Sequence, residues 1–243
     1  TCKIGFFDTN GTLLDKWEIK TNTENNGESI LSDVAKAVDN KLAQEAISKD
    51  DVQGIGIGVP GPVDSQGVVH RCVNLGWGVV NVAEELGNLT GLTIKVGNDA
   101  NVAALGEMWQ GGAKGSKDVI MVTLGTGVGG GIIVDGKVVA GFNGAGGEIG
   151  HITVNNDEIE ACNCGQYGCL EQYTSATGIV RLAKRKLAKS SEETSIREIP
   201  NLTAKDVFDA AKAGDAIAIG LVDEVCEILG STLSNICLLY TSP

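Results

Sequence analysis

Apolar residues recur along the first half of the chain at two spacings, one typical of strands and the other of helices. Short apolar or alternating runs predict strands, at residues 3–7, 13–19, 54–63 and 93–96. Apolar positions three and four apart predict helices, at residues 30–46, 82–89 and from 101 to Trp109, with Ser29 placed to cap the first of them. The predicted order is strand, strand, helix, strand, helix, strand, helix, with Asn10-Gly11 as the turn of an opening hairpin.

The pattern restarts after the polar segment 111–117. Residues 118–124 and 132–134 predict strands on either side of a glycine-rich loop, and 174–189 and 203–236 predict helices. Thr203 and Asp206 have the spacing of a capping box at the start of the last helix. Because each half opens with a strand, a turn and a strand, we expect an α/β protein of two related lobes, residues 1–112 and 113–243, with the boundary within 111–116.

Composition limits the possible partners and the compartment. The net charge of −12 and the pI of about 4.6 disfavour nucleic acid and anionic membrane as partners. No apolar run is long enough to cross a membrane, and no signal peptide is visible at Thr1. The seven cysteines are unevenly spaced and do not form the pattern of a disulfide framework, which favours a reducing, cytoplasmic setting.

Three of the cysteines stand close to one of only two histidines. The spacing is H-x10-C-x-C-x4-C, formed by His151, Cys162, Cys164 and Cys169. One imidazole and three thiols match a tetrahedral zinc site, and four protein ligands would make that zinc structural. Gly165 and Gly168 would let the backbone fold back toward the first two cysteines. The alternative is a set of buried cysteines beside an unrelated histidine.

Two carboxylates flank this cluster: Glu148 lies three residues before His151, and Glu171 lies two after Cys169. Metal binding would bring both toward one surface, where they could bind a ligand; the alternative is that both are solvated surface acids.

The run TLGTGVGGG (123–131) and the run GNDAN (97–101) are two further candidates for chemistry. Glycines let backbone N–H groups converge on an anion, and Thr126 adds a hydroxyl, although glycine-rich hairpins are common without a ligand. Asn98 and Asp99 follow a strand and precede a helix. A carboxylate there can accept a proton from a bound hydroxyl, or Asp99 can simply cap the helix.

Taken together, these motifs resemble the ROK family of sugar kinases and repressors, and within it the glucokinases of the Gram-positive bacterial type. The likeness rests on TLGTGVGGGIIVDGKVVAGFNGAGGEIGH (123–151), CNCGQYGCLEQY (162–173), GVPGPVD (58–64) and GNDANVAALGE (97–107). It implies an actin-like ATPase (ribonuclease H-like) fold of two lobes with a cleft between them. It also implies a dimer or tetramer that transfers the γ-phosphate of ATP, with Mg²⁺, to the 6-hydroxyl of a hexose.

The resemblance also implies roles for individual residues. Asp99 would be the general base and would contact the sugar. The other sugar ligands would be Gly61, Asn74, Asn98, Glu148, His151 and Glu171, and the nucleotide phosphates would meet Gly125, Thr126, Gly127 and Gly129. His151 would serve both zinc and sugar through its two ring nitrogens.

At both ends the sequence departs from the family pattern. The first phosphate loop, of the form Asp-x-Gly-Gly-Thr, is missing before Thr1, and the adenosine-binding part is missing after the last helix. Residues 237–243, CLLYTSP, do not continue the pattern and read as foreign sequence. We therefore expect a fragment that binds ATP poorly; whether it is active is open, and a chain with both ends restored is the one in which to measure turnover.

Three other functions fit the same motifs. The first is a kinase for another hexose, such as fructose, mannose, N-acetylmannosamine or allose. The second is a sugar-sensing transcriptional repressor of the same family. The third is a zinc-stabilised sugar-binding module without catalysis.

Overall fold

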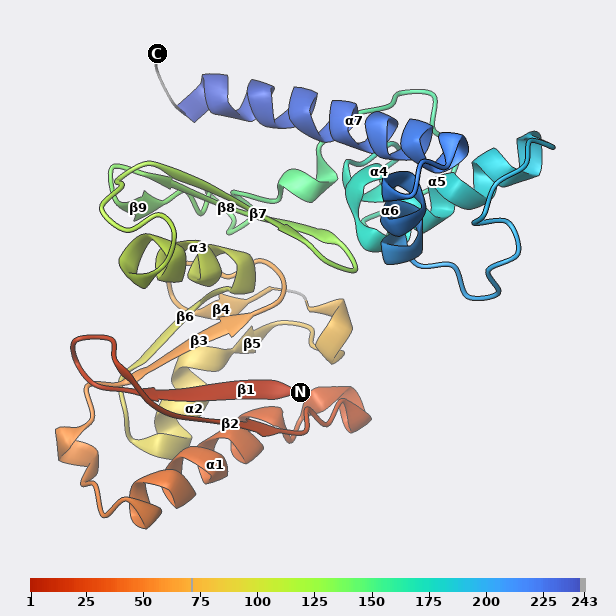
Figure 1. Cartoon of the computed structure of the whole chain (residues 1–243). Coiled ribbons are helices and arrows are strands. Elements are labelled where there is room, and N and C mark those ends of the chain that lie inside the picture. Colours follow the sequence, from red (N-terminus) through yellow and green to blue (C-terminus); the bar gives the residue numbers. More distant parts are fainter. Residues whose placement is uncertain (71, 241–243) are drawn as a thin grey trace. The chain divides into compact units, whose positions relative to one another are not determined.

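The computed structural model describes residues 1–70 and 72–240 and divides the chain into two compact units. The first unit consists of Thr1–Ser116 and Val138–Gly146, and the second of Lys117–Lys137 and Gly147–Pro243. The chain therefore enters the second unit at Lys117, returns to the first at Val138 and leaves it again at Gly147. Figure 1 shows the elements of each unit in the order of the sequence.

The first unit contains strands and helices in the predicted order. They are β1 (Cys2–Phe7), β2 (Leu13–Ile19), α1 (Ile30–Gln44), β3 (Ile55–Val59), β4 (Val68–Val69), β5 (Val80–Asn81), α2 (Val82–Thr90), β6 (Ile94–Asn98) and α3 (Asp99–Gln110). Strands β1 and β2 form the predicted antiparallel hairpin, and β3 pairs with β6 in parallel. The short strands β4 and β5 were not predicted from the sequence.

Helices cover both faces of the β3–β6 pair (Figure 1). Helices α1 and α2 bring Val34, Ala35 and Leu86 against Ile55 and apolar neighbours of the strands on one face, and α3 packs against the other through buried Ala104. The predicted cap of α1 is wrong in one respect. Ser29 does precede the helix, but its backbone is already helical and its hydroxyl accepts no capping hydrogen bond.

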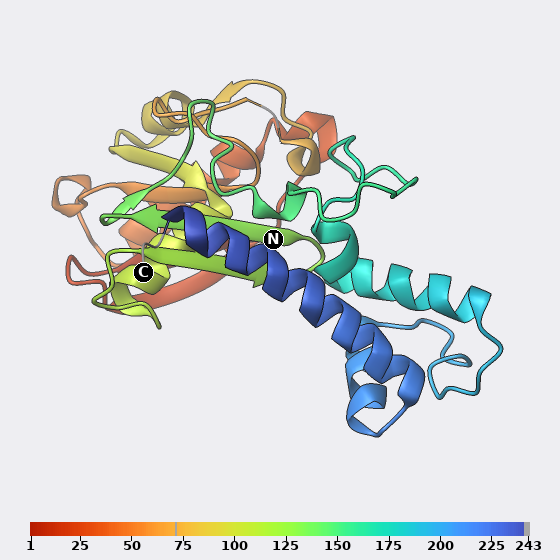
Figure 2. The ribbon, with the colours of Figure 1, turned by 90° about the horizontal axis from the view of Figure 1, so that it is seen from above.

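The second unit combines a small sheet with a group of helices. Its elements are β7 (Val119–Leu124), β8 (Val128–Val134), β9 (Lys137–Val138), the 3-10 turn Ile149–His151, α4 (Glu171–Thr174), α5 (Ala176–Lys189), α6 (Ala204–Lys212) and α7 (Ala216–Tyr240). Their core gathers Tyr173 and the apolar faces of the last three helices. Helix α7 also runs alongside the β7–β8 hairpin (Figures 1 and 2). None of the described helices combines the length and the apolar character needed to cross a membrane.

Two predicted elements of this unit have different bounds. The single helix expected over 203–236 is two helices, because Gly214 has a positive φ of 93° and Asp215 accepts a hydrogen bond from Ala218 N at the start of α7. The capping box of Thr203 and Asp206 is present at the start of α6. The strand expected over 132–134 begins at Val128, so part of the predicted glycine loop is strand. Of the segment 237–243, residues 237–240 continue α7 and the rest lie outside the described residues.

Candidate functional site

In the first unit, candidate residues meet where the two parallel strands end. Val59 of β3 lies opposite Asn98 of β6, so the turn after β3 and the start of α3 share one edge of the pair. At that edge Asn98 Nδ2 donates to the carbonyl of Gly61 over 3.2 Å. Gly61 has a φ of 98°, a conformation that a residue with a Cβ adopts only with strain. The carboxyl edge of parallel strands is where open α/β sheets place their ligands.

The N-cap of α3 is Asn98 and not Asp99, so the interpretation of Asp99 as the helix cap is wrong. Asn98 has an extended backbone, and its Oδ1 accepts hydrogen bonds from Ala100 N and Asn101 N at 3.0 and 3.1 Å. Asp99 is the first helical residue and its side chain is exposed. The cap is thus supplied by the neighbour, and the Asp99 carboxylate lies next to the positive end of the helix dipole.

A cleft of about 380 Å³ adjoins this edge within the same unit. It is lined on one side by Asn98, Asn101 and their neighbours on α3, and on the other by the returning segment from Val138 to Gly144. Asn74 is exposed in the 3-10 turn Val73–Leu75.

In the second unit the structure brings the histidine and the three cysteines into one cluster. The candidate ligand atoms of His151, Cys162, Cys164 and Cys169 all lie within 4.8 Å of one another. His151 Nδ1 is 3.8 Å from Cys162 Sγ, and the sulfurs of Cys164 and Cys169 are 3.6 Å apart. Cys162 and Cys169 are buried, while Cys164 is exposed.

The backbone between these ligands folds back on itself as the glycines predicted. Gly165 and Gly168 have positive φ of 89° and 70°. A Cβ on Gly168 would lie 1.8 Å from the carbonyl oxygen of Asn155, so only glycine allows the two strands of this loop to approach so closely. Cys162 N donates to Gln166 O over 2.7 Å and closes the loop that carries the paired cysteines.

The donor set fits zinc on chemical grounds. Burial raises the pKa of the Cys169 thiol to about 12 and also raises that of Cys162, so buried thiols at these positions keep their protons in the absence of a compensating charge. A divalent cation supplies that charge, because a cysteine binds a metal as the thiolate. Three sulfurs and one imidazole nitrogen are the ligands of a structural Cys3His zinc site, and they leave no coordination position for water.

The predicted phosphate loop is the tip of a β-hairpin. Strands β7 and β8 pair antiparallel from Val119–Ile133 to Leu124–Val128, which leaves Gly125, Thr126 and Gly127 as the turn. Gly129 lies within β8, opposite Thr123. Strand β8 needs a glycine at position 130 because the segment after Gly147 crosses it there: a Cβ on Gly130 would lie 2.4 Å from the side chain of Ile149.

Residues around α4 and the start of α5 hold the hairpin tip. Ala176 N donates to Gly125 O over 2.9 Å, and Thr177 Oγ1 donates to Thr126 O over 2.8 Å. Glu171 Oε2 accepts from Val128 N at 2.9 Å, while its other oxygen is 3.9 Å from Cys162 Sγ. Glu171 therefore lies between the metal cluster and the hairpin, and it is not a solvated surface acid. Glu148 is half-buried and precedes the turn that carries His151.

The metal segment is also held by a group of polar side chains that was not predicted from the sequence. Glu158 and Glu160 pair with Arg181 and Arg185 of α5, and Gln172 bonds to the backbone of the segment. One sequence pattern could have indicated these ion pairs. Arg181 and Arg185 lie four residues apart on a predicted helix, and residues 157–160 of the preceding segment include three acids.

Comparison with known proteins gives a consistent result. The sequence model described as "ROK family" matches residues 1–242. The glucokinase of Halalkalibacterium halodurans is 44% identical over 240 residues, which cover 97% of this chain and 73% of that protein.

Solved structures show the same fold. A ROK family glucokinase from Streptomyces griseus, solved in complex with glucose and AMPPNP, is 33% identical, has a TM-score of 0.74, and is matched over 98% of this chain and 77% of its own. A ROK family transcriptional regulator, a homolog of the E. coli MLC protein, is 25% identical with a TM-score of 0.82, over 98% of this chain and 60% of its own. The mixed α/β architecture is therefore the actin-like fold of these proteins.

Proposed function

The chain belongs to the ROK family, and from this premise we propose that it phosphorylates glucose at its 6-hydroxyl with ATP as the donor. The similarity to the glucokinase of H. halodurans extends over 97% of the chain. The single observation that carries the proposal is the placement of Asp99. It is an exposed carboxylate at the carboxyl edge of parallel strands, and its neighbour Asn98 has taken over the capping role.

Asp99 would act as the general base. As the 6-hydroxyl oxygen attacks the γ-phosphorus, the carboxylate accepts the hydroxyl proton, and the bond from the γ-phosphorus to the leaving ADP oxygen breaks. Little further covalent chemistry is required of the protein in phosphoryl transfer, which depends mainly on positioning and charge stabilisation. ATP enters with Mg²⁺, which offsets part of the phosphate charge.

Each unit would contribute its own polar groups to the substrates. In the first unit, Gly61, Asn74 and Asn98 would position sugar hydroxyls beside Asp99. In the second, the sugar would meet Glu148, Glu171 and His151, whose Nδ1 faces Cys162 and so leaves Nε2 as the nitrogen for a hydroxyl. Carboxylates, amides and imidazole suit this task because they bind hydroxyl groups in fixed geometries.

The hairpin tip would bind the nucleotide phosphates through the backbone N–H groups of Thr126 and Gly127 and the hydroxyl of Thr126. Gly125 would shape the turn, because its N–H donates to Gly127 O over 3.0 Å. The hydrogen bonds to Ala176 and Thr177 use carbonyl oxygens of the tip, so they fix its shape without consuming its N–H donors. Gly129 lies in strand β8, so it would support the phosphate-binding turn from the adjoining strand and would not be part of the turn. Zinc at the cysteine cluster would supply a structural cross-link of the loop that carries His151.

A second function has support from one specific observation. The transcriptional regulator has a TM-score of 0.82 with this chain, so the same fold also serves transcriptional regulation, which favours the sugar-sensing repressor as the second candidate. Phosphorylation of another hexose stays an alternative, because the same ligands accommodate several sugars, and so does a zinc-stabilised sugar-binding module without catalysis.

The deciding experiment measures ADP release with ATP, Mg²⁺ and a panel of hexoses. Two proteins are compared: the purified chain, and a chimera that adds the segments of the H. halodurans glucokinase lying outside the matched region. Glucose-dependent turnover that disappears in Asp99→Ala supports the proposal. Turnover with a different hexose changes the substrate, and sugar binding without turnover in the chimera favours the sensor.

The cysteine cluster also bears on the cellular location. A cluster of three metal-binding thiols requires reducing conditions, which supports a cytoplasmic location. We expect a homo-oligomer, a dimer or a tetramer, which light scattering of the purified protein would measure.

A further inference from the structure

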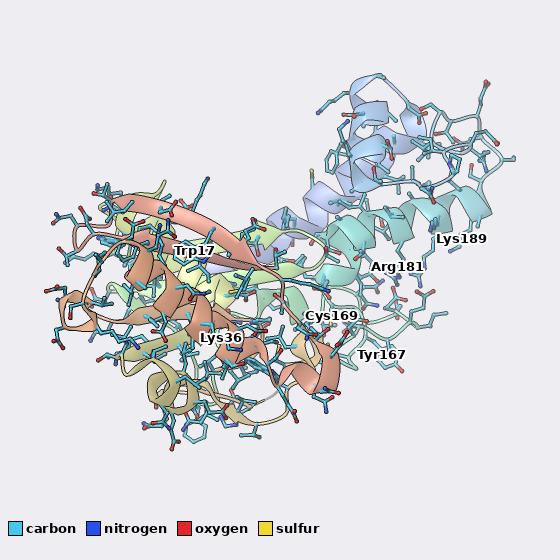
Figure 3. The ribbon with its side chains drawn as sticks, turned by 90° about the horizontal axis from the view of Figure 1, so that it is seen from below. Trp17, Lys36, Tyr167, Cys169, Arg181 and Lys189 are labelled. Atoms are coloured by element: carbon cyan, nitrogen blue, oxygen red, sulfur yellow. The ribbon has the colours of Figure 1, made fainter. Side chains whose placement is uncertain are left out.

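Glu158 is a buried acid in the loop between His151 and Cys162. Its side chain is 1% exposed, and it belongs to no group of residues discussed for catalysis. Its carboxylate accepts hydrogen bonds from Arg185 Nη1 and Nη2 at 2.9 and 2.8 Å, from Tyr173 OH at 2.7 Å, and from Arg181. Both arginines belong to α5, which leads away from the metal segment past Arg181 to Lys189 (Figure 3).

The same carboxylate also fixes the backbone of its own loop. Glu158 Oε1 accepts from the N–H groups of Ile159 and Glu160 at 2.9 and 3.0 Å. The conformation of the two residues that lead toward Cys162 is therefore tied to the position of the carboxylate, and the carboxylate is tied to α5.

Gln172 continues this network to the metal ligands themselves. Its Nε2 donates to Glu160 O over 2.9 Å, and its Oε1 accepts from Cys169 N over 3.1 Å. Arg181 Nη1 in turn donates to Gln172 O over 2.9 Å. One amide side chain thus joins the strand that enters Cys162 to the strand that carries Cys169, and Arg181, one of the two arginines that hold Glu158, also holds the backbone carbonyl of Gln172.

A buried charge network of this kind is a poor source of net stability. Desolvation of the ions offsets most of their attraction, so an apolar anchor would hold the loop against α5 at least as firmly. Directional hydrogen bonds do something that an apolar anchor does not: they allow only one register of the loop on the helix. That register sets the spacing between the Cys162–Cys164 pair and the Cys169 sulfur.

We propose that Glu158 and Gln172 are positioning residues of the metal site, which present Cys162 and Cys164 to His151 and Cys169 in the geometry that binds zinc. This role concerns the cluster alone and does not depend on which sugar is phosphorylated. Partners outside the ligand set that orient metal ligands typically change metal affinity by about 10- to 100-fold when removed.

The test measures zinc affinity by competition with a chromophoric chelator for the purified chain, for Glu158→Gln and for Gln172→Met. Glu158→Gln keeps the shape and removes the charge, and Gln172→Met keeps the length and removes both hydrogen bonds. We expect zinc affinity to fall about 10- to 100-fold in each variant. In the Co²⁺-substituted protein we expect a changed visible spectrum, which reports ligand geometry directly.

The matched control is Asp215→Asn. Asp215 is another carboxylate of the second unit that accepts several hydrogen bonds, from Thr194, Ser195 and Ala218 N, at the start of α7. Its variant should lower the thermal midpoint and leave zinc affinity unchanged. The proposal is overturned by wild-type zinc affinity in Glu158→Gln, or by an equal loss of affinity in Asp215→Asn. If Glu158→Gln does not fold, Tyr173→Phe removes one bond to the same carboxylate, and unchanged zinc affinity there also overturns it.

Discussion

The two candidate regions are held in place by different kinds of structure. The edge with Asn98 and Asp99 is built from regular backbone: two parallel strands, a helix and one side-chain cap. The metal segment from 150 to 173 is mostly irregular chain, and side-chain hydrogen bonds and the cysteine cluster define its course. Residues in the first region are positioned by local rules of the chain, and those in the second by contacts with one another.

This difference predicts how each region responds to damage. Loss of one side chain at the strand edge should remain local, because the strands and the helix keep their own hydrogen bonds. Loss of one member of the metal segment should spread through the segment, because the other members depend on it.

The largest effect is expected from Cys169→Ser, which removes a fully buried ligand of the cluster. Zinc should be lost from the purified protein, and hydrogen exchange should rise throughout residues 150–173 while β6 and α3 stay protected. Metal analysis and hydrogen exchange measure the two effects. Cys226→Ser, at an exposed position of α7, is the control and should keep zinc. A full complement of zinc in Cys169→Ser would contradict the metal site.

Asp99→Asn should damage chemistry and leave structure intact. Because the side chain is exposed and is not the cap, we expect the thermal midpoint and the zinc content to stay unchanged. Turnover in the hexose assay should fall by about 10²- to 10⁴-fold, the usual contribution of a general base. Asp135→Asn, an exposed acid whose positive φ of 54° suits asparagine, is the control. Full turnover in Asp99→Asn would remove Asp99 as the base.

Acid should weaken the metal segment through Glu158. The guanidinium of Arg185 holds the pKa of the Glu158 carboxyl well below its ordinary value of 4.5. A folded-state pKa below the unfolded one gives stability that is complete above pH 4.5 and is lost as the pH falls below it. The free energy of unfolding, measured with urea at a series of acidic pH values, should fall with decreasing pH in both proteins. In Glu158→Gln this dependence on pH should be shallower by up to about 1.4 kcal/mol per pH unit. Equal slopes in both proteins would mean that the pair contributes nothing to acid sensitivity.

The smallest effect is expected from Asn98→Ala, which tests the local character of the strand edge. Removing the cap should lower the free energy of unfolding of the first unit by about 1 kcal/mol, as at other helix N-caps. Chemical denaturation measures this change. Asn98→Ser retains a capping oxygen and should recover part of it. A loss of zinc in Asn98→Ala would contradict the separation between the two regions.

The same contrast explains what could be predicted from the sequence. Strands β1, β2, β3 and β6 and helices α1, α2 and α3 follow apolar periodicity and were expected in this order. The four candidate metal ligands could be grouped from the sequence, because zinc binds few residue types and these residues occur close together here. Asn98 and Asp99 could be placed at a strand end, but which of them caps the helix is a matter of backbone angles that the pattern does not contain.

The errors arose where distant contacts decide local structure. The sequence pattern indicated a loop for Gly129 to Gly131, yet these glycines are strand because they pair with β7, and the segment around Ile149 packs closely over Gly130. The break between α6 and α7 depends on Asp215, which binds Thr194 and Ser195 some twenty residues earlier. Glu158 and Gln172 were missed for the same reason, since single polar residues show their role only when their partners are in place.

The return of Val138–Gly146 to the first unit also has a consequence for biosynthesis. A ribosome that has released Thr1–Ser116 has not yet supplied this segment, in which Gly144 approaches the backbone of Val63 so closely that a Cβ would lie 2.5 Å from the Val63 carbonyl oxygen. Strands β7 and β8 are synthesised in between. The first unit therefore completes its fold only after the start of the second has emerged, so nascent chains halted near Ser116 should be targets for chaperones and proteases.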